Sequence, residues 1–156
     1  MSLSFAWILL GLLALMLLAA GWFDLRSRTI PNELCGAIAL AALPFWWANG
    51  LDPWPDVALQ IGVAALVFAL FAAAFAIGAM GGGDVKLIAA VALWLPWQAV
   101  IGLLVIMSLA GGALTLALVV RKRLARSEGQ LEIPYGVAIA FGGLWLIGER
   151  FLYQFG

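Results

Sequence analysis

Apolar segments, most of them near twenty residues long, make up the greater part of the chain and are separated by short polar or turn-rich stretches. Such a segment is long enough to cross the roughly 30 Å hydrocarbon core of a bilayer as a helix. The pattern predicts six transmembrane helices, at about residues 3–23, 31–48, 56–78, 84–97, 98–120 and 133–151. We therefore expect an all-α, polytopic membrane helix bundle that forms a single domain over residues 1–156.

The composition agrees with this fold class and limits the kinds of catalytic and binding site that the chain can form. Hydrophobic residues make up 66% of the chain and charged residues 10%, which is typical of an integral membrane protein. The net charge of zero provides no basic surface for nucleic acid. The single cysteine, Cys35, excludes an internal disulfide and a cysteine-based zinc site, and the absence of histidine excludes Ser-His and Cys-His nucleophiles. Only carboxylates remain for acid-base chemistry, and we expect neither a metal nor a cofactor.

Small residues recur along the third predicted helix at alternating spacings of four and three. They are Ala58, Gly62, Ala65, Ala69, Ala72 and Ala76. A stripe of this period lets neighbouring backbones approach closely in left-handed membrane packing. It predicts that the third helix lies at the centre of the bundle.

A glycine-rich stretch, Gly81-Gly82-Gly83-Asp84-Val85-Lys86, places an acid and a base after the third helix. Ionisable groups at membrane depth are costly and persist mainly where they have a function. The glycines can adopt φ > 0 and allow another segment or a substrate strand to approach. Only about 20 Å of helix separates Asp84 from Trp97, which predicts that Asp84 sits in a recess below the membrane surface. The alternative is an interfacial turn, with Asp84 as an N-cap and Lys86 reaching the headgroups.

A second acid, Asp24, follows the first predicted helix. If alternate loops share a side, one side holds seven of the eight basic residues and the other holds Arg150. The seven are Arg26, Arg28, Lys86, Arg121, Lys122, Arg123 and Arg126. The positive-inside rule places these loops in the cytoplasm and both termini outside. Asp24 and Asp84 can then meet at one depth on the cytoplasmic side.

Two carboxylates held close together cannot both ionise readily, so they share a proton. The charged member can draw a proton from a water that attacks a peptide carbonyl, while the protonated member donates to the carbonyl oxygen. The alternative is that Asp24 pairs with Arg26 or Arg28, and Asp84 with Lys86, as interfacial anchors. Another acid pair, Asp52 and Asp56, lies in a proline-rich outer loop, and we do not expect it to be catalytic.

Four features occur in a fixed order: Asp24, Ile30-Pro31-Asn32, Gly81-Gly82-Gly83-Asp84-Val85-Lys86 and Ile133-Pro134-Tyr135-Gly136. In this order they resemble the type IV prepilin peptidase family of GxGD membrane aspartyl proteases. The resemblance implies that Asp24 and Asp84 are the catalytic pair. It also implies that other motif residues shape the site or bind substrate, namely Gly81, Gly83, Lys86, Pro31 and Asn32.

The same resemblance implies partners and a location. The substrate would be a prepilin or pseudopilin whose short basic leader is cleaved at the cytoplasmic face of a bacterial inner membrane. The pilus assembly machinery would be a further partner. Larger family members carry an N-terminal segment with two cysteine pairs and also methylate the new N-terminus. This chain begins with a transmembrane helix and lacks those cysteines, so it looks more like the short, peptidase-only form found with Flp-type pili and tight-adherence systems.

Another class of protein also uses acids inside a membrane. Asp24 and Asp84 could mark the ion pathway of a transporter subunit, or belong to an assembly scaffold. Both acids lie toward one face, however, and the sequence has no recognisable inverted repeat. These two observations count against transport.

Overall fold

The computed structural model describes residues 2–126 and 133–155. Residues 127–132, which lie between the last two predicted helices, are outside the described residues. The described residues form six α-helices and one short π-helical segment, η1, and contain no strand. The elements are α1 (Ser2–Ser27), α2 (Asn32–Ala48), η1 (Pro53–Val57), α3 (Ala58–Ala76), α4 (Gly82–Ala92), α5 (Trp97–Leu124) and α6 (Tyr135–Phe155). The predicted all-α bundle is confirmed.

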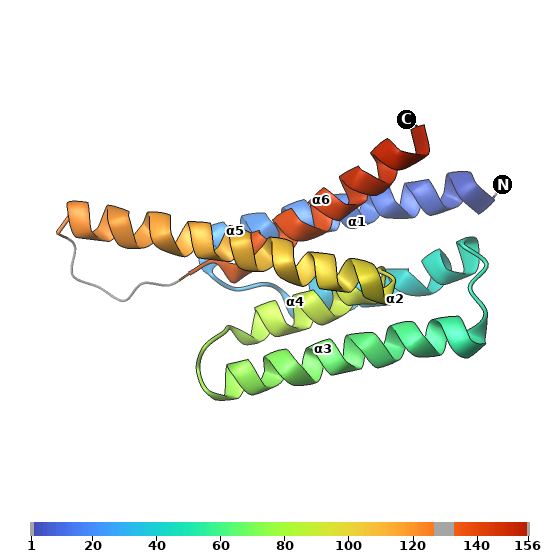
Figure 1. Cartoon of the computed structure of the whole chain (residues 1–156), viewed down its shortest axis with the longest axis horizontal. Coiled ribbons are helices and arrows are strands. Elements are labelled where there is room, and N and C mark those ends of the chain that lie inside the picture. The colour runs from blue at the N-terminus through green and yellow to red at the C-terminus, as the bar shows by residue number, and fades with distance from the viewer. Residues whose placement is uncertain (1, 127–132, 156) are drawn as a thin grey trace.

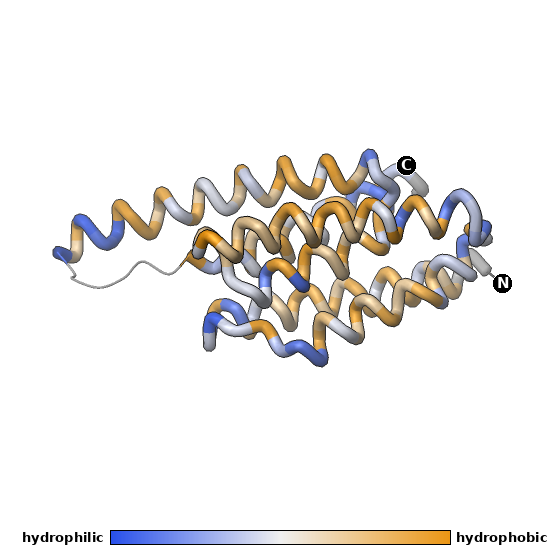
Figure 2. Tube along the Cα trace, turned by 90° about the horizontal axis from the view of Figure 1, so that it is seen from below, coloured by the Kyte–Doolittle hydropathy of each residue, from blue (hydrophilic) through white to orange (hydrophobic). Residues whose placement is uncertain are grey.

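The helices run up and down along one long axis, and both termini lie at the same end (Figure 1). The connections from α1 to α2 and from α3 to α4 lie toward the opposite end, as does the C-terminal end of α5. Helix α6 packs on α1 and α5, while α4 packs on α2, α3 and α6. Hydrophobic residues cover the lengths of the helices, and hydrophilic residues collect toward their ends (Figure 2).

Four segments of the described chain are long and apolar enough to cross a membrane. They are Phe5–Ser27, Pro53–Ala76, Trp97–Leu124 and Tyr135–Tyr153. Helix α2 has 17 residues and α4 only 11. At about 1.5 Å per residue α4 covers roughly 16 Å, about half of a hydrocarbon core. Helix α4 is therefore too short to cross a hydrocarbon core by itself.

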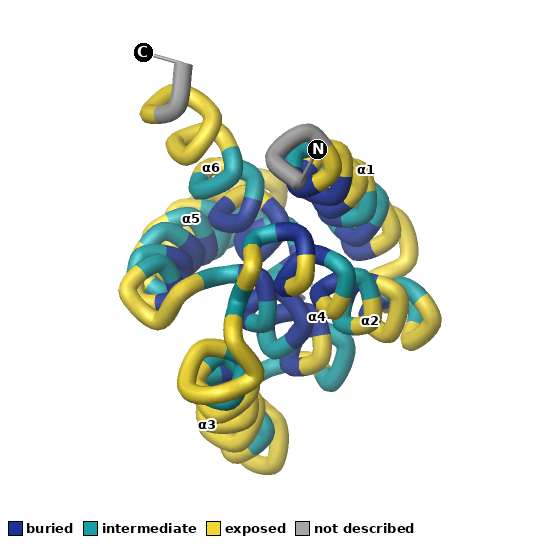
Figure 3. The backbone as a smooth tube through the Cα atoms, turned by 90° about the vertical axis from the view of Figure 1, so that its right-hand side faces the viewer, coloured by how far each residue is buried: buried dark blue, intermediate teal, exposed yellow. Residues whose placement is uncertain are grey.

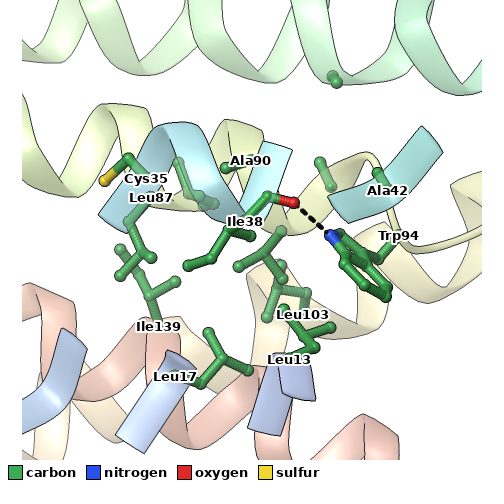
Figure 4. Packing of buried hydrophobic residues seen from close by; sticks show 14 of the residues in the cluster. Leu13, Leu17, Cys35, Ile38, Ala42, Leu87, Ala90, Trp94, Leu103 and Ile139 are labelled. Atoms are coloured by element: carbon green, nitrogen blue, oxygen red, sulfur yellow. Dashed lines mark hydrogen bonds between the residues drawn. The ribbon is translucent and has the colours of Figure 1, made fainter. Parts of the chain in front are cut away.

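The most deeply buried side chains lie where α4 meets α1, α2, α5 and α6. Figure 4 shows Leu13, Leu17, Leu87, Leu103 and Ile139 converging there. Two indoles tie α4 to α2: the Trp94 Nε1–H donates to the Ile38 carbonyl at 2.9 Å, and the Trp46 Nε1–H donates to the Leu93 carbonyl at 2.8 Å. Buried indole N–H groups require such partners. Helix α4 is thus fixed at the centre of the bundle.

The prediction that the third helix lies at the centre is wrong. Figure 3 shows α3 at the edge of the bundle, with most of its surface exposed. Its buried residues are Ala64 and Val67, which are not members of the small-residue stripe. A Cβ on Gly62, which is a member, would meet no atom within 4 Å. Small and large apolar residues can both face lipid, so the stripe did not determine which face of α3 packs against protein.

Candidate active site

Asp24 lies in the last turn of α1 and is only 4% exposed. Its Oδ2 accepts a hydrogen bond from the backbone N–H of Val137 at 3.0 Å. Val137 is the third residue of α6, and the first N–H groups of a helix have no partner within the helix. These free donors and the helix dipole favour a negative charge at this place. The start of α6 therefore holds the Asp24 carboxylate.

Asp84 is the third residue of α4 and is 8% exposed. Gly81 is the N-cap of this helix, with extended φ and ψ of −74° and 146°. From the third position, a carboxylate can reach back to the N-cap N–H, as in a capping box. A Cβ on Gly81 would lie 3.0 Å from Asp84 Oδ2, and the Gly81 backbone interacts with the carboxylate. Asp84 is therefore not the N-cap itself, and its carboxylate turns back over the start of α4.

The two carboxylates come together at Gly136. The Gly136 backbone interacts with both acids, and the charge of Asp24 acts on Asp84. A Cβ on Gly136 would lie 2.8 Å from Asp24 Oδ2 and 2.7 Å from Ile30 Cδ1. Real Cβ atoms do not approach this closely, so only glycine fits here without a local shift. The end of α1 and the starts of α4 and α6 thus converge on one point.

Ile30 lies in the connection between α1 and α2, is buried, and touches two glycines of the site. A Cβ on Gly83 would lie 3.3 Å from Ile30 Cβ and 3.4 Å from the Ile30 backbone nitrogen. Gly83 therefore permits close approach of this connection to α4, as predicted. Its backbone does not adopt positive φ; that conformation is found at Gly78, after α3, with φ of 76°, and at Arg28, after α1, with φ of 55°.

Three further residues of the predicted site lie on two helices: Pro31 and Asn32 are at the N-terminal end of α2, and Lys86 is in α4. Pro31 is the N-cap of α2, and Asn32 is its first residue. The Lys86 ammonium donates to Asn32 Oδ1 at 2.8 Å, so it links α4 to α2. This contact does not support the alternative in which Lys86 pairs with Asp84. Asp24 is likewise held by a backbone N–H, with Arg28 acting on it only through its charge.

The second acid pair is remote from this site. Asp52 is the N-cap of η1, Asp56 lies within η1, and both are exposed. Asp56 Oδ2 accepts a hydrogen bond from the Asp52 N–H at 3.3 Å, so it closes its own turn. In the part of the chain that the structure describes, no group of three or more metal-ligating side chains is found.

Sequence reasoning missed three contributors to this geometry. Ile30 and Gly136 belong to the sequence motifs that carry the family resemblance, but no function was predicted for either residue. No contribution was predicted for the backbone N–H of Val137. The available signal was the order Pro134-Tyr135-Gly136 at the start of an apolar helix, since a proline there marks a first turn with free N–H groups. The assembled site offers two interacting, nearly buried carboxylates, which is the equipment for general acid-base catalysis by a carboxylate pair.

The chain is similar to known proteins over most of its length. Residues 11–116, a segment that contains both Asp24 and Asp84, match the type IV leader peptidase family. The prepilin leader peptidase/N-methyltransferase of Aeromonas salmonicida (strain A449) is 30% identical over 139 residues, which cover 86% of this chain and 46% of that protein. The protein of the same name from Pectobacterium carotovorum subsp. carotovorum is 29% identical over 126 residues, covering 78% and 44%.

A third relative with this name, from Burkholderia pseudomallei (strain K96243), is 30% identical over 138 residues, which cover 81% of this chain and 41% of that protein. The chain thus spans about half the length of the curated relatives it matches. No solved structure matches it. Because the matched segment makes up more than half of the chain, this protein belongs to the type IV leader peptidase family.

Proposed function

We propose that the protein is a membrane aspartic endopeptidase that cleaves the leader peptide of type IV prepilins or pseudopilins. The observation that carries this proposal is the meeting of Asp24 and Asp84, from α1 and α4, at the start of α6. Membership of the leader peptidase family and relatives named prepilin leader peptidase support it.

The reaction uses the two carboxylates as one unit. The pair shares a proton, so one member is charged and the other is protonated. The charged carboxylate takes a proton from a water that attacks the scissile peptide carbonyl, and the protonated one donates to the carbonyl oxygen. The buried setting strengthens these interactions, because the local dielectric is lower than that of water.

The finer assignment is a substrate of the Flp type with a short basic leader. It rests on the resemblance to short, peptidase-only members of the family. A direct test incubates the purified protein in detergent with a candidate Flp-type prepilin and identifies the new N-terminus by mass spectrometry. We expect cleavage at one bond, unchanged by a metal chelator, because the mechanism needs carboxylates alone. Absence of any cleavage product from a panel of prepilins and pseudopilins would contradict the proposal.

Leader cleavage on the cytoplasmic side requires a defined orientation. Seven of the eight basic residues lie toward the end that carries the catalytic pair, three of them in the last turn of α5. We therefore expect a reporter fused after Arg126 to read cytoplasmic and one fused near Asn49 to read periplasmic. The opposite readout would place Asp24 and Asp84 away from a cytoplasmic leader and contradict the assignment.

Two adjacent glycines of α4 offer a matched test of close packing at the site. A Cβ on Gly83 presses on the Ile30 backbone, whereas a Cβ on Gly82 meets only the flexible ring of Phe75, at 3.4 Å. Both positions lie in the first turn of α4, so the change in helix propensity is similar for the two alanine variants. We expect Gly82→Ala to cleave normally, Gly83→Ala to lose roughly tenfold in rate, and Gly83→Val to be inactive while staying in the membrane. Equal rates for Gly83→Val and the wild type would show that the approach of Ile30 is unimportant.

A further inference from the structure

A cavity of about 560 Å³ opens at the end of the bundle opposite to Asp24 and Asp84. It lies where α2 and α6 end, where α3 begins and where α4 turns into α5, near the end that carries both termini (Figure 1). Its polar lining includes Asn49, Asp56, Gln60, Glu149, Arg150 and Tyr153. The proposed peptidase reaction uses none of these residues. Its volume is in the range of cavities that bind small ligands, about 300–1,000 Å³.

Gln60, one of the residues that line the cavity, has an unpaired side-chain oxygen. Its Oε1 is buried and has no hydrogen-bond partner among the described residues. A buried acceptor without a donor costs about 1–3 kcal/mol, so native proteins rarely leave one unpaired. This oxygen belongs to a residue that lines the cavity, and no donor among the described residues satisfies it.

Arg150 supplies a positive charge to the same cavity. Its Nη2 donates to Asn49 Oδ1 at 3.1 Å, and its guanidinium lies 5.5 Å from the centre of the Phe45 ring. Both of these partners are neutral, so they orient the guanidinium without neutralising its charge. A guanidinium fixed in this way matches the planar geometry of a phosphate group.

Two carboxylates and an apolar wall complete the lining. Asp56 and Glu149 offer negative charge, which suits a ligand ammonium group. Leu59, Val63 and Leu146 form apolar surface beside them, and Trp97 stands half-exposed at the rim. Tryptophan is typical of the level at which lipid headgroups lie. The cavity therefore presents groups for a phosphate, an ammonium and an acyl chain at the membrane interface.

We propose that this cavity binds the headgroup of a zwitterionic phospholipid with a primary ammonium group, in the leaflet opposite to the catalytic pair. Arg150 holds the phosphate. Asp56, Glu149 and the Gln60 Oε1 accept the N–H groups of the ammonium. The acyl chains leave along the apolar wall between α3 and α6.

Native mass spectrometry of the purified, delipidated full chain tests this proposal. The probes are phosphatidylethanolamine, phosphatidylcholine and phosphatidylglycerol with identical acyl chains, together with soluble phosphoethanolamine. We expect phosphatidylethanolamine to bind roughly tenfold more tightly than either other lipid, because the choline group has no N–H to donate and the glycerol group has no charge. Phosphoethanolamine should bind more weakly than the intact lipid, since it lacks the acyl chains. Equal binding of the three lipids, or phosphoethanolamine binding as tightly as the lipid, would overturn the proposal.

Two variants connect the lipid preference to individual side chains. Arg150→Gln should weaken phosphatidylethanolamine binding about tenfold, whereas Arg121→Gln, at the other end of the bundle, should not change it. Gln60→Leu removes the unpaired oxygen at similar volume, and it should abolish the preference for ethanolamine over choline while the protein stays folded. An unchanged preference in Gln60→Leu would show that this oxygen does not face the ligand and would overturn its assignment.

Discussion

Replacing Gly136 with alanine should lower the rate of leader cleavage by more than about a hundredfold. The added Cβ would lie within 2.9 Å of the Asp24 carboxylate and of Ile30 Cδ1, so α6 would have to move away from the end of α1. That movement separates the Val137 N–H from Asp24 Oδ2, which are now 3.0 Å apart. A displacement of about 1 Å in a catalytic group is enough for an effect of this size. Overpacking should also destabilise the protein by about 1–3 kcal/mol.

The same helix provides a matched control. A Cβ on Gly148 would meet no atom within 4 Å, so Gly148→Ala should cleave normally and gain slightly in helix stability. The measurement pairs the rate of prepilin cleavage in detergent with thermal unfolding of each variant. If Gly136→Ala cleaved at the wild-type rate, the close approach of α1 and α6 would not matter for the reaction.

Six helices could be predicted from the sequence, because apolar segments of spanning length must form helices in lipid. Their ends could not be placed as well. Helix α1 was expected to stop at residue 23 but continues to Ser27, which puts Asp24 inside a helical turn. A helix continues while its backbone groups find partners within it, and polar side chains do not interrupt it. Gly82 and Gly83, which were expected to precede this helix, form the first turn of α4.

The members of the candidate site could be named from the sequence, but most of their contacts could not. Asp24, Asp84 and the Ile-Pro-Asn stretch were singled out by their polarity or by motif. The bond between Lys86 and Asn32 joins residues 54 positions apart and depends on how α2 and α4 pack. The hydrogen bond from Val137 comes from a backbone N–H, which every residue except proline possesses. Such a donor leaves no signature in the sequence.

The small-residue stripe of α3 shows a different limit. In water, an apolar face must be buried, so a periodic pattern indicates the core. In lipid, Ala65 and Ala69 can face the acyl chains without penalty, and both are exposed. The central position instead belongs to α4, which is short and is followed by the buried Trp94. Residue size along α3 was therefore a poor guide to the centre of the bundle.

Exchange of each catalytic candidate for its amide tests the account most directly. Asp24→Asn and Asp84→Asn are nearly isosteric changes, so each should leave the bundle folded while removing one member of the proton-sharing pair. An amide can neither act as the general base nor supply the acidic proton. Because members of one catalytic unit do not contribute additively, each single variant should lose activity about as completely as the double variant.

The measurement is the conversion of a co-expressed candidate prepilin to its mature form, which is detected as a change in gel mobility. Both single variants and the double variant should leave the leader attached, with a rate at least about a hundredfold below the wild type. Asp52→Asn, which changes an exposed acid at the other end of the bundle, should process the prepilin normally. Cleavage at the wild-type rate by either Asp24→Asn or Asp84→Asn would contradict the two-carboxylate mechanism and favour a transporter or scaffold role for the two acids.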